Sequence, residues 1–277
     1  MPPAEIGLLG ASSPVGACVV ARLRSAGRSV HAFSRQSARP ELPGVCWSQP
    51  GAAGPSLAGW ISLLPLWVLP EYFPWLEQRG VRRIVVLSST SRFAKLDSAD
   101  PAEQRVARRL IAAEQSLQDW ADARGVEWVI LRPTLIYGSG RDHNVAEIAR
   151  FHRRHGFFPV FGAACGLRQP VHVEDVAQAC CAGLDVPGAA GQAYSLSGAE
   201  ALSYQDMVRR TVAAAGLRPR VLRLPLWAFR LGLRGLRVLP RCRDWSLGMA
   251  ERMNHDQTFE HAEAVRDLGF APRSFMP

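Results

Sequence analysis

The chain has 277 residues, of which 48% are hydrophobic and 21% are charged, and its formal net charge is +9 at pH 7. This length and balance indicate a globular protein with a sizeable core and exclude an intrinsically disordered chain. No apolar run approaches the ~18 residues of a membrane-spanning helix. The first ten residues lack the basic stretch of a signal peptide, and no two cysteines have C-x-x-C spacing. We therefore expect a cytoplasmic protein with no metal site.

The first third of the chain alternates strand-like and helix-like segments. Residues 5–10 form a short apolar run, and residues 14–26 carry apolar side chains on one side of a helix. Gly27 ends this helix, and residues 29–34 form a second strand-like run. A β-α-β unit of about thirty residues is the usual opening of a doubly wound parallel sheet.

The alternation continues to about residue 138. Further strands are expected at 60–64, 83–88 and 127–131, and a long helix at 103–124. Shorter elements follow, with another strand–helix piece at 169–184 and a mostly helical region over 200–277. The fold predicted is α/β, a Rossmann-like doubly wound parallel sheet with a small, mostly helical C-terminal subdomain.

The turn after the first strand is rich in glycine and small polar residues. Glycines allow a tight turn and a close backbone approach to a pyrophosphate, and the following helix N-terminus supplies amide donors. We predict a dinucleotide site here, and the alternative is a strand-to-helix turn that binds nothing. The expected contacts in the turn are Gly10, Ser12, Ser13, Pro14, Val15 and Gly16.

The end of the second strand distinguishes between dinucleotides. NAD-binding proteins usually have an acid there for the ribose 2′-hydroxyl, but no acid occurs here before Glu41. Ser34 and Arg35 occupy this place, and an arginine can pair with a 2′-phosphate through two hydrogen bonds. NADP(H) is therefore favoured over NAD(H), unless Arg35 is simply a surface arginine. Further cofactor contacts are expected at the ends of later strands, at Leu64, Ser88 and Pro133.

Several further motifs stand in order along the chain. They are the hydroxyl-rich strand end at 87–91, the run at 131–138, the segment at 168–175, and Leu268-Gly269-Phe270 followed by Pro272. Together with the glycine turn, these motifs resemble the extended branch of the short-chain dehydrogenase/reductase superfamily, the NAD-dependent epimerase/dehydratase-like proteins. The resemblance runs over nearly the whole chain and implies a sugar diphosphate as substrate.

The resemblance also implies a division of the chain. Residues 1–138, together with about 169–198, are expected to form the dinucleotide-binding Rossmann domain. Residues 139–168 and 199–277 are expected to form the substrate-binding subdomain.

The catalytic motif of this superfamily is missing. Its members use Tyr-x-x-x-Lys on the helix after the fifth strand, where the tyrosine transfers a proton and the lysine lowers the tyrosine pKa. The chain has a single lysine, Lys95, and the motif would require a tyrosine at the position of Ser91. Counting back from Glu114 places the two motif positions near Val106 and Leu110, which cannot transfer protons.

Candidate replacements follow the neighbouring strands. Ser89, Thr90 and Lys95 lie beyond a central strand, at the sheet edge where ligands bind, and Tyr137 ends the next strand. Lys95 could hold the nicotinamide ribose or lower the pKa of a hydroxyl, and Ser89 or Thr90 could orient a substrate oxygen. Tyr137 is a second proton-donor candidate. The alternatives are a solvated loop lysine and a tyrosine packed in the core.

Substrate contacts are also implied by the resemblance. Arg168 and Arg252 match arginines that bind the substrate diphosphate, and each guanidinium offers a planar fork to a pair of oxygens. The alternative is two surface salt bridges. His143 and Asn144 lie in the substrate-facing region, where Asn144 could instead cap the following helix.

Residues 218–243 contain eight arginines and no acid. A helix is expected over 226–241, with an arginine stripe and a wide apolar face that suit a membrane interface. The alternative is a core-packed helix whose arginines face solvent or a substrate phosphate. Nucleic acid is not an expected partner, because no aromatic–basic interleaving accompanies the charge.

The function predicted is therefore an NADP-dependent reductase, epimerase or dehydratase acting on a sugar diphosphate, free or polyprenyl-linked. One alternative is a catalytically inactive NAD(P)-binding assembly or sensor protein that lacks the Tyr-x-x-x-Lys dyad. Another is an isoprenoid or aromatic reductase. The remaining expectations are membrane-surface contact through 218–243 at the inner membrane face, and a homodimer.

Overall fold

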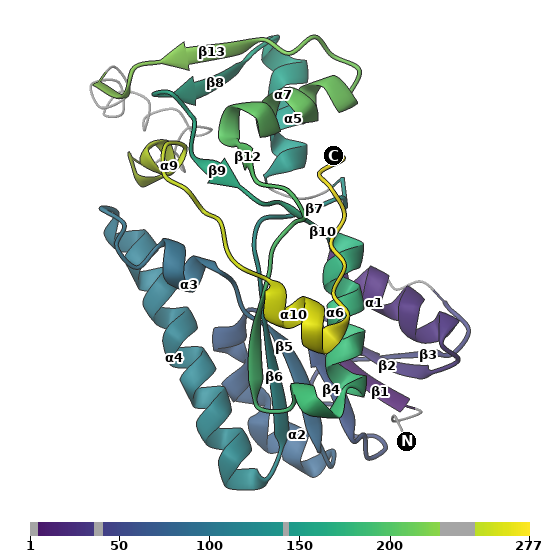
Figure 1. Cartoon of the computed structure of the whole chain (residues 1–277). Helices are drawn as coiled ribbons and strands as arrows, with labels where there is room; N and C mark the ends of the chain where they lie inside the picture. The colour runs from purple at the N-terminus through teal and green to yellow at the C-terminus, as the bar shows by residue number, and fades with distance from the viewer. Residues whose placement is uncertain (1–4, 36–40, 141–143, 228–246) are drawn as a thin grey trace.

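The computed structural model describes residues 5–35, 41–140, 144–227 and 247–277 (Figure 1). Its lower part is a seven-stranded parallel sheet in the order β11-β6-β5-β4-β1-β2-β3. Its upper part holds smaller two-stranded sheets and the helices around them. The α/β, Rossmann-like prediction is confirmed.

The elements have the following bounds. The strands of the large sheet are β1 (Glu5–Leu9), β2 (Ser29–Phe33), β3 (Val45–Ser48), β4 (Gly59–Ser62), β5 (Arg83–Leu87), β6 (Glu127–Pro133) and β11 (Gln192–Leu196). The helices beside it are α1 (Pro14–Ser25), η1 (Leu66–Tyr72), α2 (Phe73–Gln78), α3 (Ser91–Ala94), α4 (Pro101–Arg124), α6 (Val173–Asp185), η2 (Pro187–Ala189) and α10 (Ala262–Leu268). The upper part contains β7 (Ile136–Tyr137), α5 (Val145–His155), β8 (Phe158–Phe161), β9 (Leu167–Arg168), β10 (Val171–His172), β12 (Leu202–Ser203), α7 (Tyr204–Ala214), β13 (Val221–Leu224) and α9 (Leu247–Arg252).

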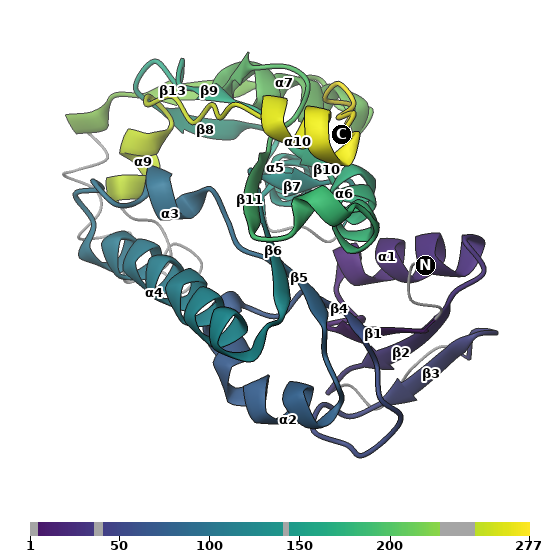
Figure 2. The ribbon, with the colours of Figure 1, turned by 60° about the horizontal axis from the view of Figure 1, so that its bottom comes forward.

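The large sheet has a separate core on each face. Ile6 and Leu8 of β1 pack toward α1, α6 and α10, whereas Leu9 and Trp60 pack toward α2 and α4. Figure 2 shows these two helical layers on either side of the sheet. Successive side chains of a strand point to opposite faces of the sheet, and both faces are covered by helices. The sequences of these strands are therefore continuous apolar runs.

Local sequence sets the bounds of the long helix α4. Its first residue is Pro101, and the Asp100 side chain accepts a hydrogen bond from the Ala102 amide at 2.8 Å. Gly125 ends the helix with a φ of 62°, a left-handed conformation that suits glycine. The start and end of α4 are thus set by residues next to it in the sequence. The helix expected at 103–124 therefore forms, and it begins two residues earlier, at Pro101.

The structure differs from the sequence predictions in two places. It adds the edge strand β3 and the strand β11, through which the chain returns to the large sheet after β10 and α6. The C-terminal region is only partly helical, because β12 and β13 lie within it. The helix expected over 226–241 falls mostly outside the described residues. In the part of the chain that is described, no helix is long and apolar enough to cross a bilayer.

The contact between β1 and β4 leads to a stability prediction. A Cβ on Gly7 would lie 2.3 Å from Trp60 Cε3, and the fully buried Trp60 ring stacks on Phe33. We expect Gly7→Ala to lower the free energy of unfolding by about 1–3 kcal/mol in urea denaturation, because the core is overpacked. Gly188→Ala is the control, since its Cβ would meet no atom within 4 Å. Equal losses in the two variants would contradict the prediction.

Candidate functional site

A cavity of about 1340 Å³ lies between the carboxyl edge of the large sheet and the upper part of the molecule. Ser89, Thr90 and Lys95 line its sheet side, and α5 forms much of the opposite wall. Apart from Glu147, which pairs with Arg150, the charged side chains of the lining are basic. These cations are Lys95, Arg150, Arg154, Arg168 and Arg252. The cavity therefore suits an anionic ligand.

The cavity also has apolar walls of aromatic side chains. They come from α5, β8, α7 and the segment before α10, and they are Phe151, Phe158, Phe161, Tyr204 and Phe259. A ligand that joins an anionic group to a flat or apolar group would contact both kinds of surface.

Lys95 lies just beyond α3 at the sheet side of the cavity. Burial lowers the pKa of its ammonium group, the charge of Arg252 lowers it further, and Asp100 opposes both effects. Within the described residues, its Nζ makes no hydrogen bond or ion pair. Lys95 is therefore a partly buried cation whose donors are available to a ligand in the cavity.

The hydroxyl groups after β5 differ in their surroundings. The Thr90 side chain is buried and its Oγ1 donates to the Pro133 carbonyl at 3.2 Å, whereas Ser89 Oγ accepts from the Ser91 amide at 3.1 Å. Ser88 is not part of the cavity lining, and its Oγ donates to Glu114 at 2.5 Å. Ser89 acts only as an acceptor in its contact, whereas Thr90 and Ser88 donate their hydroxyl hydrogens. The Ser89 hydroxyl can therefore still donate to a ligand.

Glu114 joins α4 to the neighbouring elements. Its carboxylate is 2% exposed and pairs with Arg132 of β6 at 2.6 Å and with Arg92 of α3. The α4 positions where the missing catalytic dyad would fall, Val106 and Leu110, are not among the residues that line the cavity. Leu110 is 5% exposed and belongs to the buried face of α4. Leu110 is therefore packed in the core, whereas Val106 is half-buried.

Arg168 lies in the roof of the cavity and is 5% exposed. Its guanidinium donates to the carbonyls of Leu167 at 2.7 Å and His255 at 2.9 Å, and to the carbonyl of Arg252. The two arginines expected to act together thus lie against each other at one cavity. Three of the five N–H donors of Arg168 are engaged by the backbone, which leaves two for a ligand.

Arg252 ends α9 and lines the same cavity. Its guanidinium forms an ion pair with Glu103, a carboxylate near the start of α4 that also accepts from Ser98 Oγ at 2.7 Å. This pair links α9 to α4. A ligand that binds Arg252 must share the guanidinium with Glu103 or displace it.

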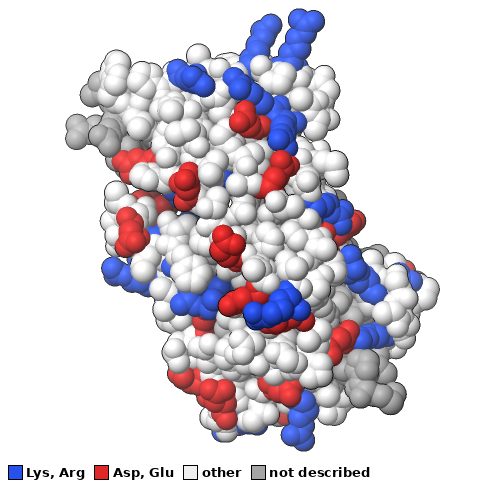
Figure 3. All heavy atoms as spheres, in the orientation of Figure 1, with Lys and Arg blue, Asp and Glu red and all other residues white. Residues whose placement is uncertain are grey.

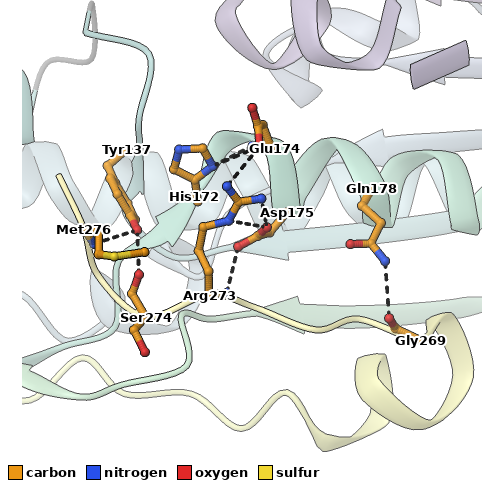
Figure 4. A network of polar contacts seen from close by, with 9 residues as sticks. All are labelled: Tyr137, His172, Glu174, Asp175, Gln178, Gly269, Arg273, Ser274 and Met276. Atoms are coloured by element: carbon orange, nitrogen blue, oxygen red, sulfur yellow. Dashed lines mark hydrogen bonds and ion pairs between the residues drawn. The ribbon is translucent and has the colours of Figure 1, made fainter. Parts of the chain in front are cut away.

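The structure places Tyr137 away from the cavity. Its side chain is fully buried, and its hydroxyl donates to the Ser274 carbonyl at 3.1 Å and accepts from the Met276 amide at 3.2 Å. Burial raises the pKa of this hydroxyl. Figure 4 shows the C-terminal segment running past Tyr137. These contacts are those of a packed tyrosine and do not favour the proton-donor role.

The same C-terminal segment is held to α6. Arg273 pairs with Asp175 at 2.8 Å and with Glu174 at 2.9 Å (Figure 4). His172 precedes α6, and its Nδ1 accepts from the Glu174 amide at 3.3 Å. Burial and the charge of Arg273 lower the pKa of His172, so its neutral form suits this acceptor role. His172 is therefore held in a structural contact at the start of α6.

Of the two polar residues expected before α5, only one can be placed. His143 lies outside the described residues. Asn144 occupies the N-cap position of α5, but its side chain makes no capping hydrogen bond, and it lines the cavity. This placement is compatible with a substrate contact.

The turn between β1 and α1 is tight, and its glycines are needed for its shape. Gly10 has a φ of 77°, and a Cβ on Gly16 would lie 2.5 Å from the Ala11 carbonyl oxygen. Ser13 caps α1 by accepting from the Gly16 amide at 3.0 Å. Pro14 and Val15 begin α1. The glycines therefore permit a tight turn that directs the N-terminus of α1 toward the end of β1.

The residues expected at the ribose differ in exposure. Ser34 is 4% exposed and its hydroxyl donates to Ser12 Oγ at 3.1 Å, which joins the end of β2 to the turn. Arg35 is exposed and directly precedes the undescribed residues 36–40. Leu64 and Pro133 stand at the ends of β4 and β6, where Leu64 packs against the core on the α4 face. In the described ranges, no cluster of three or more His, Cys, Asp or Glu could hold a metal ion.

Residues 73–197 match the model of the NAD dependent epimerase/dehydratase family. The match covers less than half of the chain and shows a similarity to this family. The match begins at α2 and extends through β5, α4 and β6 to the end of β11. It therefore includes Ser89, Thr90, Lys95 and Arg168, but neither the β1–α1 turn nor Arg252.

Two curated proteins and one solved structure illustrate the relationship. UDP-glucose 4-epimerase of Vibrio cholerae is 29% identical over 119 residues, which are 43% of this chain and 36% of that protein. The NADH dehydrogenase 1 alpha subcomplex subunit 9 of Arabidopsis thaliana mitochondria is 27% identical over 150 residues, 54% of this chain and 35% of that protein. MoeE5, solved with UDP-glucuronic acid and NAD, aligns with a TM-score of 0.71 and 21% identity, covering 98% of this chain and 94% of that one.

These similarities support the epimerase/dehydratase fold over the whole chain. The chain spans half or less of the length of the curated relatives it matches. The comparisons therefore establish the fold.

Sequence reasoning missed most of the α5 wall of the cavity. Phe151, Arg150 and Arg154 all line the cavity from α5. The four-residue spacing of Arg150 and Arg154 predicts that they share one side of a helix. The spacing does not predict which side of the helix faces the cavity.

The contacts of Tyr137 lead to a second prediction. We expect Tyr137→Phe to lower the free energy of unfolding by about 1–2 kcal/mol in urea denaturation and to speed amide hydrogen exchange at Met276. Both effects follow from losing the hydroxyl that holds the C-terminal segment. Tyr72→Phe is the control, because the Tyr72 hydroxyl makes no hydrogen bond within the described residues. Unchanged stability together with lost turnover would instead identify Tyr137 as a proton donor.

Proposed function

We propose that this protein is an NADP(H)-dependent epimerase, dehydratase or reductase that acts on a sugar diphosphate. The observation that carries the proposal is the basic cavity at the carboxyl edge of the parallel sheet. There, Ser89 and Lys95 lie in one cavity with Arg168 and Arg252. Ligands of open α/β sheets bind at this edge.

The roof of the cavity would bind the diphosphate. Arg168 retains two N–H donors after its backbone contacts, and Arg252 lies against it. Both guanidinium groups can donate paired hydrogen bonds to phosphate oxygens. Asn144 and the aromatic walls would contact the remaining parts of the substrate. Nucleotide sugars are the ligands named for the Vibrio epimerase and for the MoeE5 structure.

The β1–α1 turn would hold the dinucleotide. The N-terminus of α1 suits the pyrophosphate, and Arg35 would pair with the 2′-phosphate of NADP(H). Ser34 would act through the turn, because its hydroxyl already binds Ser12. A bound nicotinamide would supply hydride transfer to and from the substrate.

Lys95 would take over part of the role of the missing dyad. Its ammonium group lies in the cavity with no acceptor among the described residues, beside the Ser89 hydroxyl in the same lining. In its protonated form it can donate a hydrogen bond to a substrate oxygen and stabilise negative charge on that atom. Ser89 would orient the same oxygen, whereas Thr90 already donates its hydroxyl hydrogen to Pro133.

In this proposal, different parts of the chain bind the cofactor and the substrate. We assign residues 1–138 and about 169–198 to cofactor binding, and residues 139–168 and 199–277 to substrate binding. The aromatic walls and the neighbouring basic segment at 218–243 make a polyprenyl-linked sugar a reasonable form of the substrate.

The second candidate function is a cofactor-binding assembly or sensor protein without turnover. Two observations favour it, namely the apolar residues Val106 and Leu110 at the positions of the dyad, and the similarity to a subunit of a mitochondrial NADH dehydrogenase. The experiment that separates the two candidates is a turnover assay of the full chain with NADP(H) and a panel of UDP-sugars, alongside calorimetric titration of both ligands. Tight binding of both ligands without turnover would favour the second candidate.

The third prediction concerns Lys95. We expect Lys95→Met to reduce turnover about 100-fold while the affinity for UDP-glucose changes much less, because the side chain acts on the reacting oxygen. Lys95→Arg is the matched variant, and it should keep UDP-glucose affinity and more of the turnover than Lys95→Met, since a guanidinium also donates hydrogen bonds and carries a positive charge. Full activity of Lys95→Met would remove Lys95 from the mechanism.

The pH profile gives a separate check on Lys95. Only the protonated amine can donate to the substrate oxygen, so activity should fall as pH rises through the lysine pKa. Because burial and Arg252 lower this pKa, the decline should begin at a lower pH than for a solvated lysine. A rate that does not fall across the alkaline range would exclude the protonated amine as the donor.

The fourth prediction concerns cofactor choice. We expect Arg35→Ala to weaken NADPH binding about 10- to 100-fold, with little change in NADH binding, because a charge-assisted phosphate contact is lost. Calorimetric titration of both cofactors measures the change. Arg22→Ala, at an exposed position of α1, is the control. Unchanged discrimination in Arg35→Ala would remove this arginine from the ribose site.

A further inference from the structure

One end of the molecule combines exposed arginines with exposed apolar side chains. It is formed by the end of α5, the loop after α7, and β13, which pairs in parallel with β8. We call this region the end surface and define it by Arg153, Arg154, Phe157, Arg218, Arg220, Leu222 and Trp227. Figure 3 shows basic side chains gathered at this upper end of the molecule.

Three large apolar side chains of the end surface are exposed to solvent. Phe157 is 37% exposed, Leu222 is 45% exposed and Trp227 is 65% exposed. Phe157 and Leu222 also line one shallow hollow with the aliphatic part of Arg220. An exposed apolar cluster rimmed by polar residues indicates a contact surface.

The charge of the end surface has one sign. No acid occurs in the sequence between 148 and 173 or between 207 and 227. Other exposed arginines in these segments have partners, as Arg209 pairs with Asp206 and Arg210 with Glu200. In contrast, the guanidinium groups of the end surface form no ion pair with any residue that the structure describes. Four positive charges are therefore available to an external anion.

We propose that the end surface docks on an anionic lipid bilayer. Arginines next to the exposed Phe157 and Leu222, with the exposed Trp227 following β13, match a membrane interface, where the charges meet lipid headgroups and the apolar tips enter the acyl boundary. In the sequence, five further arginines precede the next acid, Asp244, so the positive charge continues beyond Trp227. The inference does not depend on the proposed enzymatic function.

Nucleic acid would use the same charges in a different way. Its phosphates would pair with the arginines but would leave the aliphatic Leu222 side chain without a matching surface. A bilayer accommodates the charged and the apolar parts together. The position of the cavity fits this orientation, because Arg154 contributes to both the cavity lining and the end surface. Docking would bring the cavity close to the lipid.

The experiment is co-sedimentation of the full chain with vesicles of phosphatidylglycerol and phosphatidylcholine in equal parts, compared with pure phosphatidylcholine vesicles. We expect binding to the mixed vesicles only, weakened by added salt. Arg218→Ser/Arg220→Ser should weaken it about tenfold, because two headgroup contacts are lost. The control Arg82→Ser/Arg105→Ser removes the same charge at exposed positions of the cofactor-binding part and should bind like the parent chain.

A second measurement tests the apolar contact. Lipids with brominated acyl chains should quench the fluorescence of the parent chain on binding, and Trp227→Phe should remove most of this quenching. No binding to anionic vesicles would overturn the proposal, as would equal weakening by both arginine pairs. Tighter binding to duplex DNA than to vesicles at the same ionic strength, lost in Arg218→Ser/Arg220→Ser, would assign the surface to nucleic acid instead.

Discussion

The buried guanidinium of Arg168 is the contact on which the candidate site depends. It joins the end of β9 to the carbonyls of Arg252 and His255, and so fixes the segment after α9 over the cavity. Asn254 reinforces the same junction by donating to the Phe161 carbonyl at 2.8 Å. A charge in this position is stable only because several carbonyl oxygens replace its lost water. The roof of the cavity thus has a defined shape before any ligand binds.

The floor of the cavity depends on another buried charge. Glu114 holds α4 against β6 and α3 through two arginines and Ser88, so the segment that follows β5 is fixed from below. Roof and floor are joined by the ion pair of Arg252 and Glu103. Charged groups of the cavity are therefore fixed from two sides. This arrangement is compatible with either proposed function, an altered enzyme or a ligand-binding protein without turnover.

The features that sequence predicted well are those that local rules determine. The β1–α1 turn follows from the glycines at 10 and 16 and the cap at Ser13, and α4 follows from Asp100, Pro101 and Gly125. Tyr137 could not be judged in this way, because its hydroxyl partners come from residues more than 130 positions later. The α5 wall, the Glu103 contact of Arg252 and the engaged donors of Arg168 arise likewise from tertiary packing. They require knowledge of which segments meet, and no single-sequence pattern contains that information.

The isolation of Lys95 has a practical consequence for chemical labelling. It is the single lysine of the chain and it faces the cavity, so the cavity holds the one side-chain primary amine of the protein. Its lowered pKa increases the fraction of the nucleophilic, unprotonated form at neutral pH. Acylating reagents and aldehydes followed by hydride reduction would therefore attach a probe at the site itself, apart from any α-amino group. The bond after Lys95 is likewise the only one that a lysine-specific protease can recognise, and its protection would report whether a ligand fills the cavity.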